Sequence, residues 1–174
     1  RIGYAPSSRN NLRKAMVLQG VSEKLMLEAG LLIKPEDPSR EMYDRFRDRV
    51  IFPISDRRGR IIAFGGRVLG NGEPKYLNSP ETPLFNKGNN LYALPQAVQA
   101  ARDSETILVT EGYTDVIALH QAGFKNAVAP LGTALTENQI QLLWKVVAEP
   151  ILCFDGDKAG QKAAQRAAER ALPL

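Results

Sequence analysis

Acidic side chains follow two short apolar runs, residues 107–110 and 151–154, in the second half of the sequence. These acids are Glu111, Asp115, Asp155 and Asp157. Carboxylates gathered at one place repel one another unless a divalent cation or a shared proton offsets their charge. A site for magnesium or manganese is therefore the leading hypothesis for this pattern.

Such a cluster would suit phosphoryl or nucleotidyl transfer, because two cations can hold both the attacking and the leaving oxygen. Glu111 could instead serve as a general acid or base. The aspartates also have purely structural explanations, since Asp115 and Asp157 could each cap the helix that begins beside them. Spacing alone leaves these alternatives open.

Regular alternation of strands and helices begins near residue 106. The pattern predicts strands at 107–110, 126–130 and 151–154, and helices at 114–122, 137–147 and 158–171. This βαβαβα order favours a parallel sheet with right-handed crossovers, whose ligands bind beyond the carboxyl ends of the strands. If strand 151–154 lies beside strand 107–110, Glu111 comes close to Asp155.

The first half of the chain has a different pattern. It predicts helices at 9–19, 22–29 and 95–102, a β-hairpin of strands 49–55 and 60–69, and a long ordered loop at 70–90. Pro53 favours an edge position for the first hairpin strand, and Gly65–Gly66 predicts a bulge or a close backbone approach. We therefore expect an α/β protein, with an α+β domain at 1–102 and a parallel-sheet domain at 103–174.

The composition restricts the metal chemistry. Apolar residues make up 44% of the chain and charged residues 24%, as is usual for a soluble globular protein, and no apolar run is long enough to span a membrane. The only cysteine is Cys153, expected in a buried strand, and the only histidine is His120. One of each cannot form a tetrahedral zinc site, so a bound metal should be a hard ion held by oxygen. The cysteine usage favours a cytoplasmic protein.

Charge is distributed unevenly along the chain. Residues 1–102 contain 17 Lys and Arg against 10 Asp and Glu, whereas residues 103–174 contain 6 against 9. A basic half would attract phosphates and an acidic half could hold cations, a combination suited to a metal-dependent enzyme that acts on polyanions. An unevenly charged solvated surface is the alternative explanation.

Several motifs resemble those of a known family. Glu111-Gly-Tyr-Thr-Asp115 and Asp155-Gly-Asp-Lys-Ala-Gly160 resemble the first two acidic motifs of the TOPRIM domain, which primases, topoisomerases and some nucleases share. Three upstream stretches, residues 43–54, 65–70 and 74–82, resemble the catalytic core of bacterial replicative DNA primases. The resemblance runs along the whole chain, in the same order.

This resemblance implies an enzyme that joins ribonucleotides into short RNA primers on single-stranded DNA. It implies Mg²⁺ or Mn²⁺ at Glu111, Asp115, Asp155 and Asp157, with Glu111, Asp155 and Asp157 in catalysis. It also implies a basic groove that holds the template and ribonucleoside triphosphates. The matching residues are Arg45, Arg47, Arg67, Lys75, Tyr76, Asn78 and Lys87.

The family further implies a cytoplasmic protein at the replication fork, with no membrane partner, and we expect a monomer. Its zinc-binding module and its helicase-binding region have no counterpart in this sequence, so zinc and the replicative helicase are expected only through missing parts. The third acidic motif of TOPRIM domains is also missing, which makes that domain incomplete at its C-terminus. We therefore expect weak metal binding and little primer synthesis from this chain alone.

Two other functions remain open. A phosphatase of the haloacid-dehalogenase type would use Asp155 as its nucleophile, but Glu111 would then have no role. A non-catalytic nucleic-acid-binding module would use the acids only as caps. Among the basic residues, Arg45 or Arg49 could pair with Asp44 or Asp48, and Tyr76 could fill a core with Leu77 instead of stacking on a base.

Overall fold

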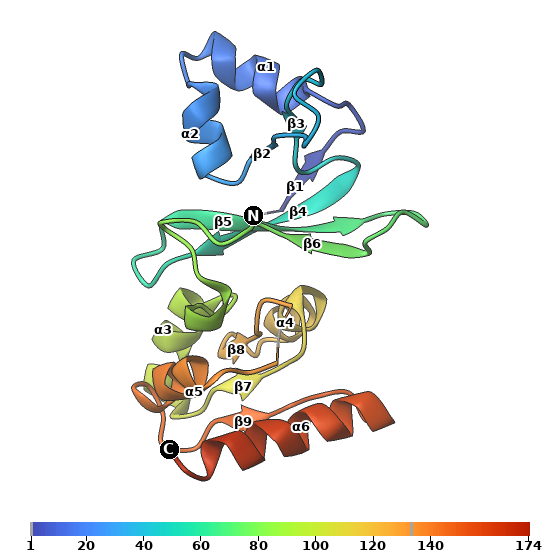
Figure 1. Cartoon of the computed structure of the whole chain (residues 1–174). Coiled ribbons are helices and arrows are strands. Elements are labelled where there is room, and N and C mark those ends of the chain that lie inside the picture. The colour runs from blue at the N-terminus through green and yellow to red at the C-terminus, as the bar shows by residue number, and fades with distance from the viewer. Residues whose placement is uncertain (1, 133) are drawn as a thin grey trace. The chain divides into compact units, whose positions relative to one another are not determined.

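The structure, a computed structural model, describes residues 2–132 and 134–174, which form two compact units (Figure 1). The N-terminal unit comprises residues 2–54 and 61–86, and the C-terminal unit comprises residues 55–60, 87–132 and 134–174. The boundary between the units therefore precedes helix α3 (Leu94–Ser104), whereas the division expected from the sequence followed residue 102.

A four-stranded sheet forms the base of the N-terminal unit. Its order is β1 (Gly3–Ala5), β4 (Arg49–Ser55), β5 (Ile61–Val68) and β6 (Tyr76–Asn78). The predicted hairpin is thus confirmed, but β1 was not predicted, and β6 lies inside the stretch expected to be a loop. The expected edge position of β4 is wrong, because β1 pairs with it. The paired segment of β4 ends at Ile51, so Pro53 lies outside it.

Two helices and a small two-stranded sheet complete this unit (Figure 1). These elements are α1 (Asn11–Leu18), α2 (Glu23–Glu28), β2 (Leu32–Ile33) and β3 (Tyr43–Asp44). Ser22 caps α2, because its hydroxyl accepts a hydrogen bond from the Leu25 amide at 3.3 Å. Gly30 follows α2 with a φ of +69°, a conformation that favours glycine.

Gly66 confirms the expected close approach in strand β5. A methyl group at this position would lie 2.9 Å from Cδ1 of Phe46 and 3.1 Å from Cδ of Arg49. The segment that carries the basic residues 45–49 therefore packs directly onto the strand that carries Arg67.

The C-terminal unit is built on a parallel sheet with the order β8-β7-β9. Its strands are β7 (Leu108–Val109), β8 (Ala127–Val128) and β9 (Ile151–Leu152). A 3₁₀ turn, η1 (Lys87–Asn89), precedes the helices α3, α4 (Tyr113–Gln121), α5 (Glu137–Trp144) and α6 (Lys158–Ala171). The parallel βαβαβα prediction is confirmed, with shorter strands than expected.

Alternating side chains of β7 enter two separate apolar clusters. Val109 packs with residues of α3, α5 and α6, including Ala97, Leu143 and Ala167. Leu108 packs with Val116 of α4 on the other side. Helices therefore cover both faces of the sheet, which holds the ends of its strands in place.

The expected burial of Cys153 was wrong. Cys153 is exposed, because it follows β9 at the sheet edge, on the same side of that strand as the half-exposed Ile151. In α6, Ala167 is buried, whereas Ala159 and Ala168 are exposed. In the part of the chain that the structure describes, no helix is long and apolar enough to span a lipid bilayer.

Candidate metal and nucleic-acid sites

The two acidic motifs meet at the carboxyl ends of neighbouring strands. Strands β7 and β9 pair in parallel, with Leu108 opposite Ile151 and Val109 opposite Leu152. Each strand continues into its acidic segment, and Oε1 of Glu111 accepts a hydrogen bond from the Asp155 amide at 2.8 Å. The predicted proximity of Glu111 and Asp155 is therefore confirmed.

Gly160 allows helix α6 to approach this junction closely. A methyl group at residue 160 would collide with the Asp155 carbonyl oxygen and would lie 2.8 Å from Oε1 of Glu111. Gly160 is buried, and its amide donates to Oδ1 of Asp157 at 2.8 Å. The first turn of α6 can therefore press against the two acidic motifs only because this position lacks a side chain.

The other two predicted metal ligands act as helix caps. Asp157 is the N-cap of α6, and its Oδ1 also accepts from the Ala159 amide at 2.9 Å. Asp115 lies in the first turn of α4, where its Oδ2 accepts from the Gly112 amide at 2.9 Å. Each cap uses one carboxylate oxygen, so capping leaves the other oxygen available to a ligand.

The four acids do not form a closed cage. Over residues 2–132 and 134–174, no three His, Cys, Asp or Glu side chains gather closely enough to hold a metal ion. A cavity of about 300 Å³ opens beside Glu111. Its wall includes Phe154 after β9, Ala167 of α6 and Arg170, whose Nη1 donates to the Leu135 carbonyl oxygen. The acidic edge of the sheet therefore adjoins a partly enclosed space.

Arg67 and Tyr76 form an exposed pair on neighbouring strands of the N-terminal unit. They face each other in the register of β5 and β6. Nε of Arg67 donates to the Tyr76 hydroxyl at 3.2 Å, and its guanidinium carbon lies 5.8 Å from the ring centroid. Tyr76 is 42% exposed, so it does not fill a core. A cation beside an open aromatic ring is an arrangement that single-stranded nucleic acids can use.

The arginines before and within β4 differ in their surroundings. Nε of Arg45 donates to the Asn78 carbonyl oxygen at 3.4 Å, and Nη1 of Arg47 donates to the Asp44 carbonyl oxygen at 2.6 Å. Arg49 is 6% exposed and its Nη1 donates to the Lys75 carbonyl oxygen at 3.4 Å, so Arg49 is buried in the unit and does not offer its charge to solvent. Burial lowers the pKa of Arg45 and of Arg49.

The proposed ion pairs of Arg45 and Arg49 with neighbouring acids do not form in the described part of the chain. Asp44 is buried and accepts from the Leu12 and Arg13 amides at 2.7 and 2.9 Å, which caps α1. Asp48 accepts from the Tyr4 hydroxyl at 2.6 Å. Asp44 therefore supports the backbone and Asp48 the side chain of Tyr4, and neither pairs with Arg45 or Arg49.

Lys75 and Lys87, the two predicted lysines, lie in different units. Lys75 is exposed, just before β6 in the N-terminal unit. Lys87 begins η1 in the C-terminal unit, where its carbonyl oxygen accepts from Nε2 of Gln139 at 2.9 Å. Lys75 thus shares a unit with the predicted arginines, whereas Lys87 shares one with the acidic site.

Known families match both parts of the chain. Residues 1–98 match the family model described as DNA primase catalytic core, N-terminal domain, and residues 105–174 match the Toprim domain. The DNA primase of Pseudomonas aeruginosa is 57% identical over 172 residues, which are 99% of this chain and 26% of that protein. The chain thus spans about a quarter of the length of this curated relative.

Solved primase structures have the same fold. A DnaG primase catalytic domain bound to single-stranded DNA is 50% identical, with a TM-score of 0.87, covering 99% of this chain and 53% of that one. The zinc-binding and RNA polymerase domains of the Aquifex aeolicus primase are 41% identical, with a TM-score of 0.89, covering 98% of this chain and 42% of that one.

Proposed function

We propose a function from one established premise: this chain belongs to the DNA primase catalytic core family, whose N-terminal domain model matches residues 1–98. The proposal is that the chain forms part of the core that synthesises RNA primers on single-stranded DNA. The observation that carries it is the meeting of Glu111 and Asp155 at the ends of paired parallel strands. Ligand sites of open α/β sheets lie at this position.

Divalent cations suit the donor set at this edge. Carboxylate oxygens are hard ligands, and Mg²⁺ is often held by one or two carboxylates together with substrate phosphates and water. Glu111 and Asp155 would supply these ligands. Asp115 and Asp157 follow them closely in sequence, and each has one carboxylate oxygen that does not cap a helix. Because no closed cage of three acids forms among the described residues, the proposed binding is weak until substrate phosphates complete it.

In the proposed reaction, a ribose 3′-hydroxyl oxygen loses its proton to solvent and forms a bond to the α-phosphorus of a ribonucleoside triphosphate. The bond from that phosphorus to the bridging oxygen breaks, and pyrophosphate leaves. The bound cations, Mg²⁺ or Mn²⁺, would stabilise charge on the attacking and leaving oxygens. Glu111 also fixes the backbone at Asp155 by accepting its amide hydrogen. Asp157 stabilises the start of α6 through its two capping hydrogen bonds. The acids therefore also stabilise the backbone segments that carry them.

The basic residues would hold the polyanionic substrates. Arg67 and Tyr76 offer a phosphate ligand and a stacking surface, and Arg45, Arg47 and Lys75 add positive charge in the same unit. The Asn78 carbonyl oxygen accepts a hydrogen bond from Nε of Arg45 and so helps to position that arginine. Lys87 would bind phosphate from the C-terminal unit. The bound DNA in the related DnaG structure supports a single-stranded template, and ribonucleoside triphosphates follow from the proposed reaction.

The proposal extends to the setting of the longer protein. A cytoplasmic primase at the replication fork would contact the replicative helicase through a region outside this sequence. A zinc-binding domain accompanies the polymerase domain in the Aquifex aeolicus relative, which supports zinc in a separate module. We expect this chain itself to be monomeric in solution.

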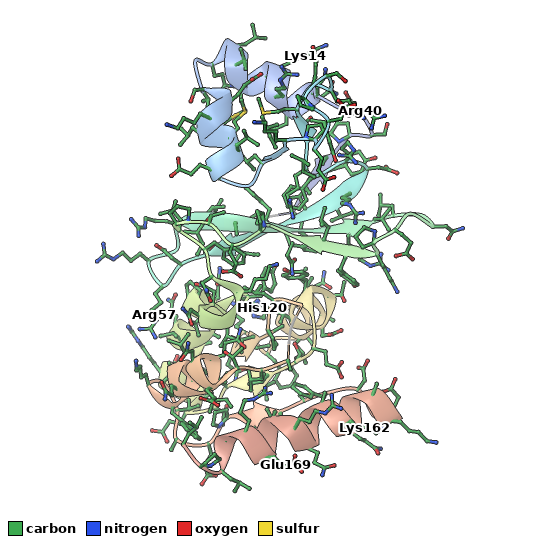
Figure 2. The ribbon with its side chains drawn as sticks, viewed as in Figure 1. Lys14, Arg40, Arg57, His120, Lys162 and Glu169 are labelled. Carbon is green, nitrogen blue, oxygen red and sulfur yellow. The ribbon has the colours of Figure 1, made fainter. Side chains whose placement is uncertain are left out.

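Manganese binding tests the acidic site directly. Titration of the chain with Mn²⁺, followed by the loss of the free-ion signal in electron paramagnetic resonance, should show binding that Glu111→Gln and Asp155→Asn each weaken about tenfold or more. The control is Glu169→Gln, which removes an exposed carboxylate of the distant half of α6, labelled in Figure 2. Equal binding by all four proteins would favour a nucleic-acid-binding module without catalytic metals.

A further inference from the structure

The ring of Tyr43 contacts two arginine side chains that come from different segments of the N-terminal unit. The guanidinium carbon of Arg9 is 4.5 Å from the ring centroid, and that of Arg47 is 4.8 Å from the same centroid. Both distances are within the range of cation–π attraction. The two positive groups can therefore be no farther apart than the sum of these distances, although 37 positions separate them in the sequence.

Backbone contacts hold all three residues in place. The Arg9 carbonyl oxygen accepts from the Asp44 amide at 2.8 Å, which fixes the loop before α1 against β3. The Asp44 carbonyl oxygen accepts from Nη1 of Arg47 at 2.6 Å. The Asp44 carboxylate caps α1, two residues beyond Arg9. The geometry of the two arginines is thus set by the backbone as well as by the ring.

The acids of this segment are bound to other groups. Asp37 pairs with Arg40, and Glu41 pairs with Arg13 at 3.0 Å. Asp44 caps α1, and Asp48 accepts from the Tyr4 hydroxyl. No carboxylate described in the structure lies within ion-pair distance of Arg9 or Arg47. Two neighbouring guanidinium groups without a counter-ion repel each other, and an anion bound between them would remove that repulsion.

We propose that Arg9, Tyr43 and Arg47 form a phosphate clamp for the backbone of single-stranded nucleic acid, with Tyr43 as the residue that positions both arginines. The proposal rests on the proposed function and adds Arg9 and Tyr43 to the residues that bind the template. Guanidinium groups match phosphate geometry and remain charged at every physiological pH. Arg45 lies between Tyr43 and Arg47 in sequence and donates to the Asn78 carbonyl oxygen of β6. Because β6 also carries Tyr76, Arg45 connects the segment of the clamp to the strand of the Arg67–Tyr76 pair.

Binding of a fluorescein-labelled DNA single strand, measured by anisotropy at several salt concentrations, tests the clamp. Arg9→Ala should weaken binding about 3- to 10-fold near 0.1 M salt and reduce the slope of log K against log salt by about 1. Tyr43→Ala should weaken binding further, because both arginines lose their support. Tyr43→Phe keeps the ring and should bind as the parent does.

A matched control is Lys14→Ala, which removes one exposed positive charge from α1 of the same unit (Figure 2). Lys14→Ala should also change the slope of log K against log salt less than Arg9→Ala does. The expected change is under half of that caused by Arg9→Ala. Arg9→Ala made in the Tyr43→Ala background should have little further effect. Thermal melting of each variant shows whether it is folded. If Tyr43→Phe binds as weakly as Tyr43→Ala, or Arg9→Ala matches Lys14→Ala, the clamp is wrong.

Two further outcomes separate this proposal from the proposed function. If the parent binds no single-stranded DNA, both fail; if the parent binds and the clamp variants bind equally well, only the clamp fails. A second titration uses a fluorescent ribonucleoside triphosphate, whose phosphates present the same chemistry. Arg9→Ala, which lies outside the residues assigned to triphosphate binding, should bind it as the parent does. Weaker triphosphate binding with unchanged DNA binding would overturn the assignment to the nucleic-acid backbone.

Discussion

The basic side chains of the N-terminal unit and the acidic side chains of the C-terminal unit differ in how far they are prepared for a ligand. Arg9, Arg47 and Arg67 each lie against a tyrosine ring, and no acid that the structure describes pairs with them. Asp115 and Asp157, in contrast, already bind backbone amides. The basic side chains are already held in place by rings and carbonyl oxygens, whereas the proposed acidic site would be completed by a cation and phosphates.

This difference follows from the chemistry of the two charges. A guanidinium group can be held by an aromatic ring and a carbonyl oxygen and still present donors to a phosphate. Carboxylates close together repel, and in the absence of a cation they are better stabilised by amide hydrogens of loops and helix ends. Recognition of the polyanion should therefore survive changes that abolish metal binding.

The largest expected effect comes from Gly160→Ala. The added methyl group would strike the Asp155 carbonyl oxygen and Oε1 of Glu111, so the two acids must separate or α6 must move away. We expect loss of Mn²⁺ binding and a destabilisation of about 1–3 kcal/mol, measured by chemical denaturation. DNA binding by the N-terminal unit should persist.

Gly156→Ala is the matched control for this prediction. It lies in the same acidic motif, but no heavy atom is within 4 Å of the position its methyl group would take. Manganese binding close to that of the parent is expected. Equal loss of binding in both glycine variants would show that loop conformation, and not the approach of α6, determines the site.

The next largest effect is expected for Tyr76→Ala. Removal of the ring takes away a stacking surface and the hydroxyl partner of Arg67, so single-stranded DNA should bind roughly 5- to 100-fold more weakly. Tyr76→Phe keeps the stacking surface and should lose much less. Manganese binding should be unchanged in both, and a parallel loss of manganese would refute the independence of the two sites.

Substitutions of Asp157 separate its role as a helix cap from its proposed role in metal binding. Their expected effects are smaller than that of Tyr76→Ala. Asn is as good an N-cap as Asp, so Asp157→Asn should keep the stability of α6 while it removes a charged oxygen. Asp157→Ala should lose the cap and about 1 kcal/mol of unfolding free energy as well. Weaker manganese binding in both variants, with lower stability only in the alanine variant, is the expected pattern in denaturation and Mn²⁺ titrations.

The smallest effect concerns the pH dependence of the N-terminal unit. The hydrogen bond to Asp48 raises the pKa of Tyr4 above its usual value in the folded state. The stabilisation is complete below the usual tyrosine pKa and is lost as the pH rises through the raised value. Alkaline unfolding curves of Tyr4→Phe should lack this loss, and an unchanged alkaline dependence would show that the bond contributes nothing.

Local signals allowed part of the fold to be predicted from the sequence. Helix α6 begins and ends where expected, because Asp157 is a strong cap and good helix formers follow it. Strand β4 also has its expected bounds. Strands β1, β2 and β6 contain only two or three residues and form by pairing with other strands, so their own sequences carry little signal.

The sites could be predicted only where a motif lies next to a strand. Glu111 and Asp155 were brought together by the order of strands and helices, which placed strand 151–154 beside strand 107–110. Arg9 and Tyr43 gave no such signal, since their contact depends on a loop held by the Asp44 amide. The exposure of Cys153 depends on what covers β9 in the folded unit, which periodicity does not report.

Anomalous diffraction from crystals of this chain soaked in Mn²⁺ would locate the bound metal. A manganese peak is expected about 2 Å from carboxylate oxygens of both Glu111 and Asp155. A manganese peak elsewhere, with none beside these two acids, would rule out the proposed metal site.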